Sequence, residues 1–228
     1  MKEKDFQGKI VCLVSGGIDS PVTCALVAKK FDIIPLHFCL YPFTCEDSFY
    51  LAMKILKDMK KATKFEKVIV YPWGPILDSI TKSDTQRRYM CVLCRRSMFK
   101  VAEKICEKEG ASAIATGESL GQKATQTLRN LRATSAGIKF PILRPLLGLD
   151  KSEIEAISKK LGIWHAHHAG CCYATPKYPT TGTKQEVLDD LFGELELDTI
   201  IEENFGKILE VKTFEEDFEG YLTSMAQS

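Results

Sequence analysis

The sequence of 228 residues lacks the features that mark several large classes of protein. It has no apolar run near the ~20 residues that cross a bilayer, and its polar first ten residues contain no apolar signal region. Its formal net charge is only +1, so it lacks the global basic character of many nucleic-acid binders, but a balanced total charge does not exclude a local basic patch. We therefore expect a cytoplasmic protein with no membrane partner.

The nine cysteines do not form the pattern of a disulfide scaffold, because their number is odd and 45% of the residues are hydrophobic. Four of them lie in apolar segments and are interpreted as small buried side chains: Cys12, Cys24, Cys39 and Cys106. Two other groups flank polar or basic residues and are candidates for chemistry. They are the pair Cys91 and Cys94 and the doublet Cys171 and Cys172.

Strand patterns alternate with helix patterns along most of the chain. Strands are predicted at 9–14, 33–39, 67–71, 113–116 and 140–143, and helices at 21–30, 46–61, 87–109 and 151–160. This alternation predicts an α/β fold: a Rossmann-like parallel sheet with helices on both faces, which binds ligands at the carboxyl ends of its strands.

The remainder of the chain is less regular. The segment 165–183 has no periodicity and is predicted to be a long loop of functional importance. Helical pieces at 184–205 and a last strand at 207–211 are expected to follow it. We divide the chain into a domain at 1–185 and a helical C-terminal extension at 186–228 that packs on it.

The strongest motif follows the first predicted strand and consists of six consecutive residues: Ser15, Gly16, Gly17, Ile18, Asp19 and Ser20. Two glycines let the backbone turn sharply and approach a ligand closely. The helix that begins here, with Asp19 or Ser20 as its cap and Pro21 at its first position, directs its unpaired N–H groups at the loop. The motif therefore predicts an anion-binding loop, and it lacks the Lys of a Walker loop.

This segment resembles the PP-loop of the N-type ATP pyrophosphatases. Members of that superfamily cleave ATP between its α- and β-phosphates, attach AMP to a carbonyl oxygen and release pyrophosphate. The resemblance implies an adenine nucleotide alpha hydrolase-like fold in which residues 15–20 bind the pyrophosphate part of ATP and Asp19 helps to place Mg²⁺.

Three further segments occur in the order found in the tRNA 4-thiouridine synthetases, which are also linked to thiamine thiazole synthesis. They are Thr116–Leu131, the run Leu143–Leu146 followed by Asp150–Ile154, and Cys171–Pro179. The resemblance spans about residues 9 to 185. It implies an ATP-dependent tRNA sulfurtransferase that adenylates O4 of a uridine, at position 8 of tRNA, and then replaces that oxygen with sulfur.

The resemblance also assigns roles around the nucleotide. Leu36, His37 and Phe38 would lie against adenine, Gly117 would let the backbone approach the nucleotide, and Gln122 would hydrogen-bond near it. Lys151, at a helix start, would offset charge on the α-phosphate. Cys172 has about the family spacing from the following Lys-x-Pro and would carry the sulfur, with the adjacent Cys171 as the alternative.

Cys91 and Cys94 are three residues apart and share a helix face, with Cβ atoms ~5–6 Å apart. With Cys171 or Cys172 they resemble the iron–sulfur site of archaeal-type thiouridylases. The alternatives are a zinc site that adds a histidine, a redox disulfide, and two unrelated helix cysteines. The histidines available to zinc are His165, His167 and His168.

Many family members carry an N-terminal RNA-binding region, and many bacterial members end in a rhodanese domain. We expect neither region in this sequence, and we therefore expect a separate RNA-binding domain or protein to help it hold tRNA. Arg95, Arg96, Arg129 and Arg132 are candidates for RNA contacts. A sulfur donor is required, and a homodimer would pool two basic surfaces.

Two rival functions remain open. One is a PP-loop enzyme with a non-tRNA substrate, thiazole included, which would release pyrophosphate without responding to tRNA. The other is a non-catalytic nucleotide- or metal-binding module. The combination of Asp19, Lys151 and the cysteines argues against the second.

Overall fold

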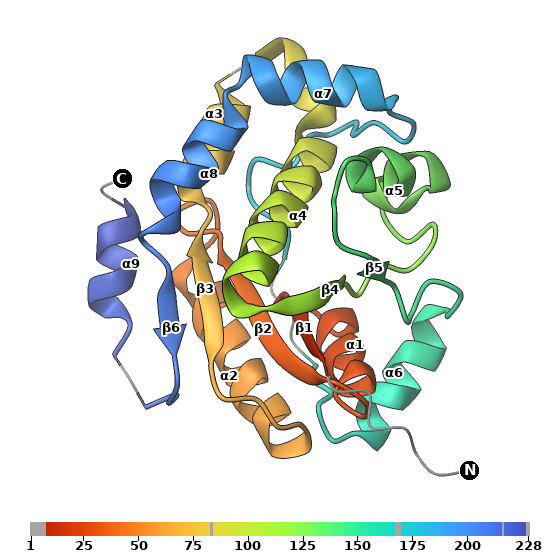
Figure 1. Ribbon diagram of the computed structural model, residues 1–228, viewed down its shortest axis with the longest axis vertical. Helices are drawn as coiled ribbons and strands as arrows, with labels where there is room; N and C mark the ends of the chain where they lie inside the picture. The colour runs from red at the N-terminus through yellow and green to blue at the C-terminus, as the bar shows by residue number, and fades with distance from the viewer. Residues whose placement is uncertain (1–7, 83, 167–169, 216, 227–228) are drawn as a thin grey trace.

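The computed structural model describes residues 8–82, 84–166, 170–215 and 217–226. Its centre is a six-stranded sheet in the order β5-β4-β1-β2-β3-β6 (Figure 1). The strands are β1 (Lys9–Val14), β2 (Asp32–Cys39), β3 (Val68–Pro72), β4 (Ala111–Ala115), β5 (Ile142–Leu143) and β6 (Leu209–Val211). The first five are parallel, and β6 pairs antiparallel with β3 at one edge.

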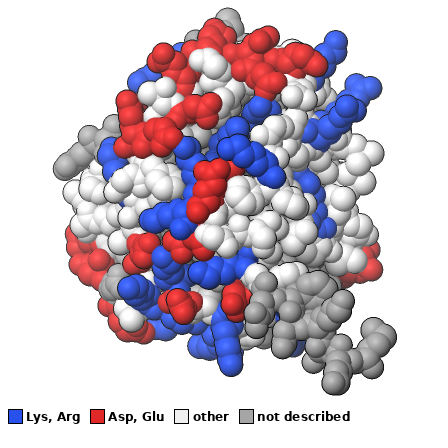
Figure 2. All heavy atoms as spheres, viewed as in Figure 1, with Lys and Arg blue, Asp and Glu red and all other residues white. Residues whose placement is uncertain are grey.

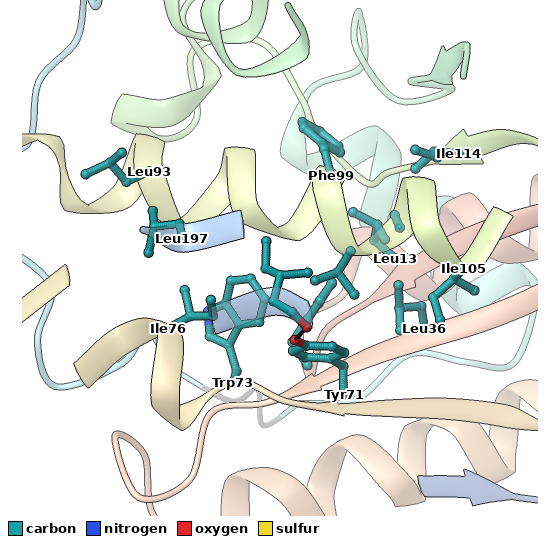
Figure 3. Close-up of a cluster of buried hydrophobic side chains, with 14 of the residues drawn as sticks. Leu13, Leu36, Tyr71, Trp73, Ile76, Leu93, Phe99, Ile105, Ile114 and Leu197 are labelled. Atoms are coloured by element: carbon teal, nitrogen blue, oxygen red, sulfur yellow. Dashed lines mark hydrogen bonds between the residues drawn. The ribbon is translucent and has the colours of Figure 1, made fainter. Parts of the chain in front are cut away.

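One face of the sheet is covered by helices from the middle and later parts of the chain. They are α3 (Gly74–Thr81), α4 (Met90–Glu109), α5 (Leu128–Ser135), α7 (Gln185–Glu194) and α8 (Leu197–Phe205). Tyr71 and Trp73 fill the space between the sheet and α4, beside Ile76 and Leu197 (Figure 3). The Tyr71 hydroxyl donates a 2.9 Å hydrogen bond to the Ile201 carbonyl, which ties α8 to β3.

The opposite face is covered by α1 (Asp19–Val27), α2 (Glu46–Ala62) and α9 (Glu219–Ala226). A further helix, α6 (Lys151–Lys160), packs on α1 through Ile154 and not on the sheet itself. The α/β class with helices on both faces is therefore confirmed. The strands are apolar almost throughout, as expected of parallel strands that are buried on both sides.

Local signals account for several element boundaries. The Asp150 side chain accepts a hydrogen bond from the Glu153 backbone, and the Glu153 side chain accepts one from the Asp150 backbone, so the predicted capping box begins α6. Gly110, with φ of 65°, ends α4 in the left-handed conformation as predicted. The described part of 165–183 contains no helix or strand.

Other expectations were wrong in detail. The helix α1 starts at Asp19, its N-cap is Ile18, and no side chain caps it, because the Ser20 hydroxyl is bound to Ser15. The residues before Met90 form a 3₁₀ helix (Asp84–Tyr89) and not the first turns of α4. The helices α3 and α5 were not predicted, whereas α9 falls within the predicted helical extension. The division of the chain at residue 185 stays a prediction.

Candidate active site

The predicted anion-binding loop joins β1 to α1 at the carboxyl edge of the sheet, and its two serines close it. The Ser15 backbone N–H donates to Ser20 Oγ at 2.8 Å, and the two hydroxyl oxygens are 3.0 Å apart. The Gly17 N–H is 3.4 Å from Ser15 Oγ. These bonds fix a tight turn in front of the N-terminus of α1, where unpaired N–H groups and the helix dipole favour an anion.

Asp19 and Lys151 are brought together at this loop. Lys151 Nζ donates a 2.8 Å hydrogen bond to Asp19 Oδ1, and their side chains are 48% and 23% exposed. Lys151 is the first residue of α6, a position that the helix dipole makes unfavourable for a cation. The carboxylate of Asp19 offsets that cost and holds the ammonium group beside the loop.

Gly117 lies against the loop backbone. A Cβ atom at this position would be 2.7 Å from the Ser20 nitrogen and 2.8 Å from the Asp19 carbonyl carbon, which is a severe clash. Gly117 is therefore required because the segment after β4 packs directly on the start of α1. Its expected role was to let the backbone approach a nucleotide. The geometry adds a steric reason that lies within the protein.

A cleft opens between the ends of β1, β2 and β4. It is lined by loop residues together with His37, Phe38, Phe49, Thr116, Gly117, Arg95, Lys123 and Gln126. Of the residues expected against adenine, His37 and Phe38 line the cleft. Leu36 does not, because it is fully buried in the core, and Ile18 is buried between α1 and α6.

His37 is buried on the floor of the cleft. Its Nδ1 donates a 2.9 Å hydrogen bond to the Val14 carbonyl, and its ring packs on Phe49 with centroids 5.9 Å apart. Burial lowers the pKa of His37 to about 4. The imidazole is therefore neutral at physiological pH and contributes a flat, uncharged surface.

Gln122 is not one of the residues that line the cleft. It is exposed, and its Nε2 donates to Ser119 Oγ at 3.1 Å. Gln126 lines the cleft in its place, and its Oε1 is buried with no hydrogen-bond partner in the described part of the chain. The role expected for Gln122 near the nucleotide stays a prediction.

The candidate cysteines lie around one end of α4. Cys91 and Cys94 are partly buried on the helix, and Cys94 Sγ accepts a 3.2 Å hydrogen bond from Trp73 Nε1. Burial raises the pKa of Cys91 to about 11 and that of Cys94 to about 12, and nearby Cys172 adds to both shifts. The doublet differs, since Cys171 is exposed near Lys123 Nζ and Cys172 is partly buried beside Thr175.

These cysteines do not form a metal-binding geometry. Among the described residues, no group of three His, Cys, Asp or Glu side chains is placed to hold a metal ion. Cys94 Sγ accepts from Trp73 Nε1 and Cys172 Sγ is 3.7 Å from Thr175 Oγ1, but Cys172 lies near enough to Cys91 and Cys94 to raise the pKa of both. For the zinc alternative, His165 Nε2 is 3.7 Å from Asp58 Oδ2, and His167 and His168 lie outside the described residues.

The four arginines that were expected to contact RNA have different surroundings. Arg96 is buried; it donates to the Ala133 carbonyl at 3.1 Å and forms an ion pair with Asp189, so it is not an RNA-facing residue. Arg95 lines the cleft. Arg129 and Arg132 are exposed on α5, and Arg129 borders a surface hollow with Arg88 and Tyr178.

Sequence reasoning missed the ion-pair cluster behind the cleft. Glu118 is fully buried between Arg95 and Arg144. Its position in the Thr116–Leu131 motif was noted, but a buried carboxylate cannot be recognised until its partners are placed. Lys123 and Gln126 lie in the same motif and were also not expected to line the cleft.

Comparison with known proteins agrees with this geometry. The family model described as "Thiamine biosynthesis protein (ThiI)" matches residues 5–197. Probable tRNA sulfurtransferases of Methanobrevibacter smithii and Saccharolobus solfataricus are 39% and 38% identical over 89% of this chain, and the alignments cover 54% and 53% of those proteins. The chain thus spans about half the length of the curated relatives that it matches.

A solved structure gives the same result. A crystal structure of a 4-thiouridine synthetase–RNA complex with bound ATP matches with a TM-score of 0.79 and 32% identity, covering 90% of this chain and 55% of that one. The described residues contain no helix that is both long and apolar enough to span a membrane. On the family model and these identities, the chain belongs to the ThiI family.

Proposed function

We propose that this chain is the catalytic part of an ATP-dependent tRNA sulfurtransferase. It binds ATP in the cleft above residues 15–20, adenylates O4 of a tRNA uridine, and replaces the AMP with sulfur to give 4-thiouridine. The observation that carries the proposal is the 2.8 Å contact of Lys151 with Asp19 beside a closed PP-loop. Relatives are probable tRNA sulfurtransferases, and the matching solved structure holds both ATP and RNA.

The adenylation step uses charge placed at the loop. The backbone N–H groups of the loop and the N-terminus of α1 bind the β- and γ-phosphates. The uridine O4 attacks the α-phosphorus, an O–P bond forms, the bond to the β-phosphate oxygen breaks, and pyrophosphate leaves. Lys151 stabilises negative charge on the α-phosphate oxygens as the transition state forms. The neutral His37 and the ring of Phe38 offer an apolar floor for adenine.

Asp19 also suits Mg²⁺ by its chemistry. It is a carboxylate on the rim of the cleft, and Mg²⁺ prefers one or two carboxylates together with substrate phosphates. When bound, the ion would neutralise charge on the leaving pyrophosphate. Asp19 Oδ1, which accepts a hydrogen bond from Lys151 Nζ, would be one of the oxygens that hold the ion.

Sulfur transfer is assigned to the cysteine doublet. The terminal sulfur of a persulfide on Cys172, or on Cys171, attacks C4 of the activated uridine, a C–S bond forms and AMP leaves. A second cysteine thiolate then attacks the carrier cysteine and breaks its S–S bond, which leaves the sulfur on the uridine and a disulfide between the two cysteines. An external thiol reductant restores the two thiols. Cys171 is the more accessible of the two, and Lys123, which lines the cleft, is 3.9 Å from its sulfur. An iron–sulfur cluster on Cys91, Cys94 and Cys172 stays a prediction, and the sulfur-transfer steps proposed here are carried by the cysteines alone.

The tRNA is proposed to approach over α5. Arg129 and Arg132 are exposed there, and the adjacent hollow is lined by Arg88 and the 77% exposed Tyr178. Figure 2 shows acidic side chains gathered at the top of the molecule over α7 and α8, which would repel phosphates. A separate RNA-binding domain or protein, a sulfur donor and a second copy of the chain remain proposed partners.

The decisive experiment for this function is to incubate the protein with ATP, Mg²⁺, unmodified tRNA, a polysulfide as the donor of sulfane sulfur and a thiol reductant, and to analyse the tRNA nucleosides by mass spectrometry. Formation of 4-thiouridine that depends on ATP supports the proposal. Thiolation of a thiazole precursor without any change in tRNA would favour the second candidate, thiamine thiazole synthesis, which the name of the matching family model supports.

A further inference from the structure

Glu118 is a buried carboxylate behind the cleft, held between two arginines. Its side chain is 0% exposed. Its Oε2 accepts a 2.7 Å hydrogen bond from Arg144 Nε, and its Oε1 is 3.5 Å from Arg95 Nε. Burial of a charge is expensive unless the charge is paired. The ion pair with Arg144, with Arg95 close on the other side, therefore accounts for a buried glutamate at this position.

The two arginines are not equivalent. Arg144 Nη2 also donates a 2.6 Å hydrogen bond to Ser135 Oγ. Two donors of the Arg144 guanidinium are therefore bound to groups within the protein. Arg95 approaches Glu118 without forming a hydrogen bond, since Glu118 Oε1 has no such partner in the described chain. Among the described residues, Arg95 forms no other ion pair, and it is 24% exposed.

Two guanidinium groups against one carboxylate leave one positive charge in excess, and Arg95 presents that charge to the cleft. Arg95 lines the same cleft as Ser15, Gly16 and Gly17. The guanidinium carbons of Arg95 and Arg144 are each 5.9 Å from the centroid of the buried Phe99 ring, which restrains both groups. A restrained guanidinium beside backbone N–H groups suits the oxygens of a phosphate.

We propose that Arg95 binds a phosphate oxygen of the nucleotide, and that Glu118, held by Arg144, is the residue that positions the Arg95 guanidinium at the cleft. This inference rests on the proposed function, because it takes ATP as the ligand. It replaces the expectation that Arg95 contacts RNA. The carboxylate fixes where the guanidinium lies, and the uncommitted donors of Arg95 remain for the ligand.

The test compares the binding of ATP and of adenosine by calorimetry in wild-type protein and Arg95→Ala. Adenosine has no phosphate, so a phosphate contact changes only the affinity for ATP. We expect Arg95→Ala to bind ATP roughly 10- to 100-fold more weakly and adenosine equally well. Arg95→Lys should restore only part of the ATP affinity, because an ammonium group lacks the planar fork. Lys108→Ala, at the far end of α4, is the matched control and should change neither affinity.

Glu118→Gln tests the positioning role. It should show the same selective loss of ATP affinity, and the double variant Arg95→Ala/Glu118→Gln should bind ATP no more weakly than Arg95→Ala alone. If Glu118→Gln does not fold, Arg95→Ala and Arg95→Lys still test the phosphate contact. Arg144→Lys then takes the place of Glu118→Gln as the test of the positioning role.

The inference would be overturned if Arg95→Ala lost affinity for adenosine and for ATP equally. It would also be overturned if Arg95→Ala kept the wild-type affinity for ATP, whether or not its tRNA binding were weaker. In those cases wild-type protein still binds ATP and the proposed function stands. Wild-type protein that binds no ATP would instead overturn the proposed function, and this inference with it.

Discussion

Lys151 Nζ and Asp19 Oδ1 are 2.8 Å apart, although 132 residues separate them in the chain. The contact joins the first residue of α6 to the first residue of α1 and places both beside the loop at residues 15–20. Asp19 and Lys151 belong to different sequence motifs, and the fold places these two motifs next to each other.

Replacing Lys151 tests its role at this point. We expect Lys151→Met to abolish AMP transfer while the protein remains folded, because the ion pair is exposed and such pairs contribute only about 0–1 kcal/mol to stability. Thermal unfolding should show little change. Lys160→Met, on the same helix, is the control and should keep its activity. AMP transfer near the wild-type level in Lys151→Met would remove Lys151 from the proposed chemistry.

Gly117→Ala should disturb the loop itself. The added Cβ would be 2.7 Å from the Ser20 nitrogen, and neither backbone segment can move away cheaply. We expect a loss of about 1–3 kcal/mol in the free energy of unfolding, measured in urea, and weaker ATP binding. Gly148→Ala is the matched control, since a Cβ there has no atom within 4 Å. Equal stability of the two variants would show that the clash is relieved.

Much of this site could be predicted because its signals are local. The run of residues 15–20 lies between an apolar strand and a helix, and such a junction has few alternative structures. The capping box of Asp150 and Glu153 likewise needs only its own four positions.

Other features depend on contacts distant in sequence and could not be predicted. Arg96 is paired with Asp189, which is 93 residues away and reaches it only because α7 packs on α4 and α5. Whether β6 runs parallel or antiparallel is decided by its pairing with β3. The pattern of apolar residues in β6 is compatible with either direction. Glu118 looks like a surface residue until Arg95 and Arg144 are placed around it.

The cysteine doublet can be separated from the helix pair by single substitutions. Cys172→Ser should spare pyrophosphate release and stop sulfur transfer, because adenylation does not use a thiol. If Cys172→Ser transfers sulfur at the wild-type rate, the carrier is Cys171 or another site. Cys91→Ser is the comparison: a loss of sulfur transfer in both variants, with iron present in the wild type, would support the cluster that the described geometry does not show.

Two arginines should behave in opposite ways. Arg96→Ala removes a buried hydrogen-bonded group and should lower the free energy of unfolding by about 1–3 kcal/mol. Arg129→Ala, on the exposed side of α5, should leave stability unchanged, weaken tRNA binding and reduce its salt dependence. Urea unfolding and binding titrations at several salt concentrations measure both effects. Unchanged tRNA affinity in Arg129→Ala would move the RNA surface away from α5.

The buried His37 predicts a pH dependence of stability. Burial lowers its pKa to about 4, whereas an unfolded histidine has a pKa of about 6.5. As the pH falls below about 6.5 the unfolded chain binds a proton that the folded chain does not, so stability decreases until about pH 4. The two pKa values correspond to a loss of roughly 3 kcal/mol.

Urea unfolding of wild-type protein and His37→Asn at about pH 7 and about pH 4.5 isolates this effect, because carboxylates titrate in both proteins. The variant should lose less stability than the wild type between the two pH values. Equal losses would mean that His37 is protonated in the folded protein.

The central claim is that this chain uses ATP to activate a tRNA uridine, and pyrophosphate release tests it most directly. Anaerobically purified protein is given ATP and Mg²⁺ with or without unmodified tRNA, and Lys151→Met is assayed beside it. The account predicts release that tRNA stimulates in the wild type and that is lost in the variant. No release from wild-type protein under either condition would contradict it.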